Sequence, residues 1–125
     1  MNRLLILPVL LLTLLVGTPA SSADFQKGLT AADKGDFATA LREWTSLAEQ
    51  GNANAQRNLG AMYGNGTGVI QDNVYAHMWL NIAASSGKKV AVKNRDIIAK
   101  RMTPAQIADA QKLARECVRK KYKGC

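Results

Sequence analysis

The sequence predicts an all-α protein, a short α/α solenoid of about six helices that pack as hairpins. Residues recur at a fixed offset of 36 positions, and periods of this size are typical of repeated helical hairpins. Apolar residues also follow helical spacing, without the alternation of strands. The recurring residues are Asp36, Ala40, Ala48 and Gly51, which return as Asp72, Ala76, Ala84 and Gly87. One hairpin cannot bury its apolar face alone, so neighbouring hairpins must stack.

Length and composition limit the chain to one small domain. It has 125 residues, of which 47% are apolar and only 6% aromatic. This length leaves no room for two domains, and the core must rest on aliphatic side chains. The apolar content also argues against disorder, because there is ample surface to bury.

Residues 1–23 have the three-part pattern of a secretory signal peptide. A basic residue opens the segment, a mostly apolar run follows over residues 4–16, and small residues close it. The run is shorter than the ~20 residues that a spanning helix needs. Cleavage is expected after Ala23, with Ala20 as second choice and an uncleaved N-terminal anchor as the alternative. Residues 24–125 then form the mature domain, which is expected to be periplasmic or secreted.

The first hairpin is expected over Phe25–Gln50. Asp36 is placed to cap the second helix of the pair, because its carboxylate can accept hydrogen bonds from free backbone N–H groups. Gly51 follows that helix, where a left-handed residue is favoured. These two residues set the limits of the helix from Phe37 to Gln50.

The second hairpin is expected over Asn54–Ser86. Its first helix runs over Asn54–Tyr63 with apolar residues at helical spacing. The segment Gly64–Gly68 should break that helix, because glycine is costly inside a helix and suits a turn. Val69 and Ile70 are expected to fold back as an apolar plug.

The third pair is expected over Lys88–Lys121 and keeps fewer of the repeated residues. Its first helix, Lys88–Arg101, has apolar residues on roughly one side. Thr103–Gln106 has the form of a capping box with proline in the first turn. The following helix has an apolar stripe of Ile107, Ala110, Ala114 and Cys117.

The second hairpin carries a set of motif residues at fixed spacing: Leu59-Gly60, Tyr63, Gly66, Gly68-Val69, Asp72, Ala76, Trp79-Leu80, Ala83-Ala84 and Gly87. On these residues it resembles a Sel1-like repeat. The first copy matches less well, and residues 102–114 resemble the tail that closes many bacterial Sel1 proteins. The resemblance implies α/α hairpins like tetratricopeptide repeats, working as adaptor or scaffold modules that are often exported in bacteria.

Small and aromatic residues in the repeats are interpreted as packing residues. Gly60 and the repeated alanines let helices approach closely, because they carry almost no side chain. Trp44, Tyr63 and Trp79 should fill the larger gaps.

No enzyme activity, metal or cofactor is predicted. His77 is the only histidine, and a surface or groove-edge position is expected for it rather than a role as base or ligand. Gly64–Gly68 lacks the preceding strand and the Lys-Ser/Thr of a phosphate-binding loop. Two cysteines and one histidine are too few for a typical zinc site.

Cys117 and Cys125 are eight residues apart. In a continuous helix they would lie ~12 Å apart along the axis, whereas a disulfide needs Cα atoms within ~7 Å. A bond therefore requires the helix to end near Lys121 and the tail to turn back, which Gly124 permits. In an exported chain with an even number of cysteines the bond is expected, and two free thiols are the alternative.

Charge is distributed unevenly along the chain. Residues 24–87 hold four Lys/Arg and six acids, whereas residues 88–125 hold twelve and three, a net charge of +9. The spacing of Lys112, Arg115, Arg119 and Lys123 predicts a basic stripe on one face of the last helix. A solvated capping face and a contact to an anionic ligand are both open for it.

Two functions follow. The first is a scaffold that holds a protein or peptide in its concave face, with Asn54, Arg57 and Asn58 as groove residues. The second is binding of an anionic envelope component, such as lipid headgroups, acidic glycan or peptidoglycan, through the basic stripe. Nucleic acid is disfavoured as a partner, because the chain is expected to be exported and no aromatic platform accompanies the charge.

Overall fold

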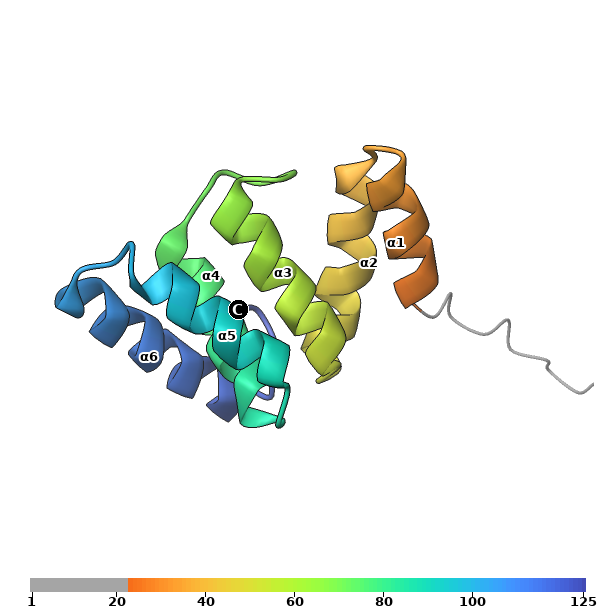
Figure 1. Cartoon of the computed structure of the whole chain (residues 1–125). Coiled ribbons are helices and arrows are strands. Elements are labelled where there is room, and N and C mark those ends of the chain that lie inside the picture. The colour runs from red at the N-terminus through yellow and green to blue at the C-terminus, as the bar shows by residue number, and fades with distance from the viewer. Residues whose placement is uncertain (1–22) are drawn as a thin grey trace, which may run out of the picture.

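The computed structural model describes residues 23–125, which form an all-α fold (Figure 1). Its helices are α1 (Phe25–Asp33), α2 (Phe37–Glu49), α3 (Ala53–Asn65), α4 (Asn73–Ser85), α5 (Lys89–Ala99) and α6 (Pro104–Arg119). The predicted fold class is therefore confirmed. The predicted signal peptide lies, up to residue 22, outside the described residues. Among the described helices, none is long and apolar enough to cross a membrane.

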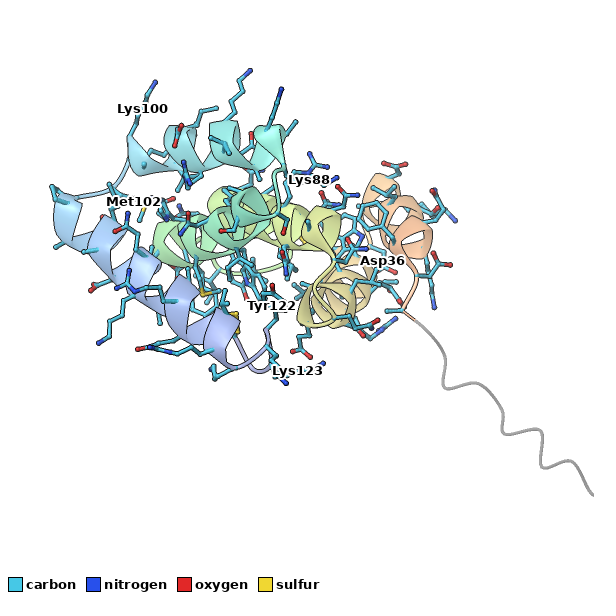
Figure 2. All side chains as sticks on the ribbon, turned by 90° about the horizontal axis from the view of Figure 1, so that it is seen from below. Asp36, Lys88, Lys100, Met102, Tyr122 and Lys123 are labelled. Atoms are coloured by element: carbon cyan, nitrogen blue, oxygen red, sulfur yellow. A yellow bond between two sulfur atoms is a disulfide. The ribbon has the colours of Figure 1, made fainter. Side chains whose placement is uncertain are left out.

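The helices pack in the order of the chain for the first two pairs. α1 packs on α2 and α3 on α4, and α2 and α4 also contact the first helix of the pair that follows. The third pair differs from the expected hairpin. α5 and α6 both pack against α4 and scarcely touch each other, and Figure 2 shows them diverging from the turn near Met102 that joins them.

The 36-residue repeat is visible in the caps of α2 and α4. The Oδ1 atoms of Asp36 and Asp72 each accept a hydrogen bond from the backbone N–H three residues on, at 3.2 Å and 3.0 Å. Gly51 and Gly87 follow the two helices with left-handed φ values of +90° and +85°. The repeated Asp residues thus cap α2 and α4, and the repeated Gly residues follow the ends of these helices, as predicted.

The glycine-rich segment ends α3 as predicted, but two details differ from the expectation. α3 does not end at Tyr63 but runs on to Asn65, so Gly64 is helical and buried. A Cβ at Gly64 would lie 2.9 Å from Cδ1 of Ile98, so this glycine makes room for α5. The chain then leaves the helix at the left-handed Gly66. Val69 packs against the core as predicted, but Ile70 does not, since 91% of it is exposed.

α4 is the central helix of the fold. Five successive residues, Ala76 to Leu80, are buried, and Ile82 and Ala83 are buried as well. A helix with one polar face would expose some of these positions. All of these positions are buried on α4 because α3, α5 and α6 pack against it.

Gly60 marks the closest approach of α3 to α4. A Cβ on this residue would lie 2.6 Å from Cγ of Leu80 and 3.2 Å from the carbonyl oxygen of Ala76. No real Cβ contact is that short, so the interhelical distance depends on the absence of a side chain.

The cysteines are bonded in the structure. Sγ of Cys117 lies 2.03 Å from Sγ of Cys125, and the two Cα atoms are 5.6 Å apart. The bond is possible because α6 ends at Arg119 and the chain turns back through Lys121 and Tyr122, whose φ values are +54° and +66°. The turn thus uses two non-glycine residues ahead of Gly124.

The bonded tail also docks on the repeats. The Tyr75 hydroxyl on α4 donates a hydrogen bond of 2.6 Å to the Cys125 carbonyl. The Tyr122 ring lies against the α2–α3 turn, 3.3 Å from the place of a Cβ on Gly51, and Figure 2 shows Tyr122 directed into the molecule. The tail therefore joins α6 to residues from both repeats.

Substitution of Gly60 by alanine should destabilise the domain. The added methyl group would force α3 away from Leu80, and overpacking of this kind costs about 1–3 kcal/mol. Urea unfolding would measure the loss. Ala61→Leu, at the next and exposed position of α3, is the matched control, and equal stability of the two variants would contradict the packing argument.

Loss of the disulfide should also destabilise the domain. Closing a loop of this length contributes roughly 2–3 kcal/mol in the chain-entropy model. Cys125→Ser should lower the free energy of unfolding by about that amount, and reduction of the wild type should give the same loss. Two alkylatable thiols in the unreduced native protein, detected by mass spectrometry, would rule the bond out.

Candidate functional site

Two pockets adjoin the exposed face of α3. One, of ≈ 230 Å³, lies toward α1 and α2 and includes Leu29, Phe37 and Asn58. The other, of ≈ 170 Å³, lies toward α5 and includes Asn94, Ile97 and Arg101. Both are lined by Ala61 and Asn65, so they meet on α3. We call this pair of pockets the α3 groove.

The predicted groove residues lie on this helix but at different distances from the pockets. Asn58 lines the pocket toward α1. Asn54 is exposed and Arg57 is half-buried on the N-terminal half of α3, and the lining of neither pocket includes them. The groove is therefore centred about one turn further along α3 than the prediction placed it.

Two polar residues of the groove were missed in the sequence, although a signal for them existed. Asn94 stands 36 positions after Asn58, and Arg101 stands 36 positions after Asn65. The repeat offset thus relates the polar lining of α5 to that of α3. The third copy has Arg95 and Asp96 where the second copy has Leu59 and Gly60. Because these motif residues differ, the correspondence between the two helices was not recognised.

The groove combines amide side chains with a floor of small residues. Each asparagine offers both a carbonyl acceptor and two N–H donors. Gly60, Ala61 and Gly64 line the pocket beside α5, so a ligand backbone can approach the helices closely. Within the part of the chain that the structure describes, no Asp or Glu lines either pocket.

His77 is buried, which contradicts the expected surface or groove-edge position. It lies on α4 with an exposed fraction of 3%, and its Nδ1 atom is buried without a hydrogen-bond partner. Burial lowers the pKa of the imidazole below its ordinary value; the cationic Arg95 on α5 lowers it further, and Asp96 opposes this. The burial could not be predicted from helical spacing, because α4 is covered by α3, α5 and α6 and has no fully exposed face.

The basic stripe is shorter than predicted. Lys112, Arg115 and Arg119 are exposed on α6, but Lys123 lies beyond the end of the helix, which the turn at Lys121 fixes. Figure 2 shows Lys123 on the opposite side of the molecule from Lys88 and Lys100, at the two ends of α5. The positive charge of residues 88–125 is therefore spread over two sides.

A third pocket lies between α4 and α6. Arg115 and Arg119 line it together with Asn81 and Ser85 of α4. Arg95 of α5 reaches the same asparagine, and its Nη1 donates a hydrogen bond of 3.0 Å to the Asn81 Oδ1. Over residues 23–125, no group of three or more metal-ligating side chains could hold a metal ion.

The fold and the groove define a class of protein. Helix pairs repeated at 36 residues, with the same capping carboxylate and terminal glycine, are those of an α/α-hairpin repeat protein. A family model described as Sel1 repeat matches residues 53–88, which comprise α3, α4 and the loop between them. Residues 53–88 thus form a Sel1 repeat. No curated protein matches it.

Acidification should destabilise the domain through His77. The folded pKa is lowered by burial, so the unfolded chain binds the proton first as the pH falls. The free energy of unfolding should therefore decrease below about pH 6.5, with a slope of at most about 1.4 kcal/mol per pH unit. Urea unfolding between pH 7.5 and pH 5.5 would measure this slope. His77→Leu should flatten it, and an unchanged slope in that variant would refute the assignment.

Proposed function

We propose that the protein is a non-enzymatic scaffold that binds a protein or peptide partner in the α3 groove. The observation that carries the proposal is the open groove itself, which α3 shares with α1 on one side and α5 on the other. Sel1 repeats generally bind proteins, so the family supports the same conclusion. A protein partner needs such an accessible and continuous surface.

An extended peptide is the form of ligand that suits the groove best. Asn58, Asn65 and Asn94 can donate to carbonyl groups and accept from N–H groups of a peptide backbone. Apolar side chains stand at both ends of the groove, with Phe37 toward α2 and Ile97 on α5. They offer contacts for side chains of the peptide, while Arg101 favours an acidic residue at the α5 end.

The proposed location is the bacterial envelope, in the periplasm or outside the cell. The disulfide between Cys117 and Cys125 supports an oxidising compartment, and the predicted signal peptide supports export. A fusion of residues 1–30 to a reporter enzyme that is active only after export tests this. Activity should be present with the native segment and absent when the apolar run is interrupted by charged residues.

The groove should lose affinity when its amides are removed. Peptides selected from a displayed random library against the wild-type protein should bind Asn58→Ala/Asn94→Ala at least about tenfold more weakly, because two hydrogen bonds are lost. Gln111→Ala, on the exposed side of α6, is the control and should bind as the wild type does. Selected peptides that bind the groove variant with unchanged affinity would contradict the proposal. Binding should also persist at high salt, which separates the groove from the basic stripe.

A second proposed function is contact with an anionic envelope component through α6. It is supported by Lys112, Arg115 and Arg119, which are exposed and form no ion pair within residues 23–125. A basic surface without ion pairs attracts anions at moderate ionic strength.

A further inference from the structure

The α4–α6 pocket is lined by positive charge from α6 and by hydrogen-bond donors from both α4 and α6. Its volume is ≈ 350 Å³, and Arg115 and Arg119 stand one helical turn apart on its α6 wall. No Asp or Glu of the described residues lines it. A pocket with two unpaired guanidinium groups and no acid is electrostatically suited to an anion. It lies on the α4–α6 layer, so it does not depend on the α3 groove.

Arg95 fixes the orientation of the Asn81 side chain. Guanidinium groups only donate hydrogen bonds, so the oxygen of the Asn81 amide must face the Arg95 Nη1 atom, 3.0 Å away. The amide nitrogen, Nδ2, then faces away from Arg95. It forms no hydrogen bond within residues 23–125 and is a free donor on a residue that lines the pocket.

The interior of the same pocket is apolar. Ile82 and Ala114 line it from α4 and α6, and Val118 stands between the two arginines in sequence with 49% of its surface exposed. A free inorganic anion would make no use of these side chains. The pocket therefore favours an anion that is attached to an apolar body.

The donors also favour phosphate over carboxylate. A planar carboxylate binds one guanidinium group in its own plane through two parallel hydrogen bonds. A tetrahedral phosphate presents oxygens in several directions, so it can accept from the arginines on α6 and from Asn81 on α4 together. Guanidinium groups and an exposed apolar side chain at one site match the boundary between the headgroups and acyl chains of a membrane.

We propose that the α4–α6 pocket binds the phosphate of an anionic phospholipid. Arg115, Arg119 and the Nδ2 of Asn81 hold the phosphate oxygens, and Val118 contacts the apolar part of the lipid. Arg95 is a positioning residue that keeps the Asn81 amide turned toward the ligand. This proposal gives the basic surface of α6 a defined site and a defined ligand group.

Vesicle co-sedimentation tests the proposal. Mature protein should bind phosphatidylcholine vesicles that contain phosphatidylglycerol, but not phosphatidylcholine alone, at ~0.15 M salt, where distant charges are screened. Arg115→Gln/Arg119→Gln should weaken binding roughly tenfold or more. Lys89→Gln/Lys93→Gln removes the same charge from exposed positions of α5 and should weaken it clearly less. Equal losses in the two variants would mean diffuse attraction and would overturn the site.

Asn81→Asp provides a second variant of unchanged shape. Its carboxylate can still accept the hydrogen bond from Arg95, so the fold should be retained, as thermal unfolding would verify. The negative charge in the pocket should abolish vesicle binding, and wild-type binding by this variant would overturn the proposal.

Titration with inorganic phosphate shows whether the ligand of the pocket is a phospholipid or a soluble phosphate. In the absence of vesicles it should shift the NMR signal of the Asn81 side-chain amide only weakly, because it lacks an apolar part. A saturating shift without any vesicle binding would overturn the lipid in favour of a soluble phosphate. If the protein shows no shift with phosphate and also does not bind vesicles, the site itself is overturned.

Discussion

The fold depends on the need to bury α4 on every side. Five successive residues of this helix, Ala76 to Leu80, are buried, and no single partner helix can cover a full turn. α3 covers one side at the contact made by Gly60, while α5 and α6 cover others. α5 and α6 therefore pack on different sides of α4 and not on each other. The third helix pair thus covers α4 and does not form a hairpin of its own. The burial of His77 and the pocket between α4 and α6 both follow from this arrangement.

Features that depend on local chemistry could be predicted from the sequence. Asp36 and Asp72 cap their helices and Gly51 and Gly87 end them, because a cap requires only a few neighbouring residues. Three of the expectations that were wrong concern His77, Ile70 and Lys123. In each case the outcome depends on which distant element covers the residue, or on where a turn redirects the chain, and helical spacing carries no information about either.

The two candidate sites differ in how far the sequence could reveal them. The α3 groove follows the repeat, so Asn58 and its counterpart Asn94 occupy related positions on α3 and α5. The α4–α6 pocket is lined by residues that the repeat offset does not relate. The hydrogen bond between Arg95 and Asn81 joins α5 to α4, and these helices are in contact because α5 packs over α4. The basic spacing on α6 indicated only one wall of that pocket.

The burial of Cys117 gives the disulfide a direction of exchange. Cys117 is 1% exposed, whereas Cys125 is partly accessible, so an external thiolate reaches Cys125 more readily than Cys117. The leaving group is then the Cys117 thiolate, which would form in an apolar environment that disfavours its charge. Poor leaving groups slow thiol–disulfide exchange. Once closed, the tail is thus protected from the shuffling of disulfides by the same core that it helps to complete.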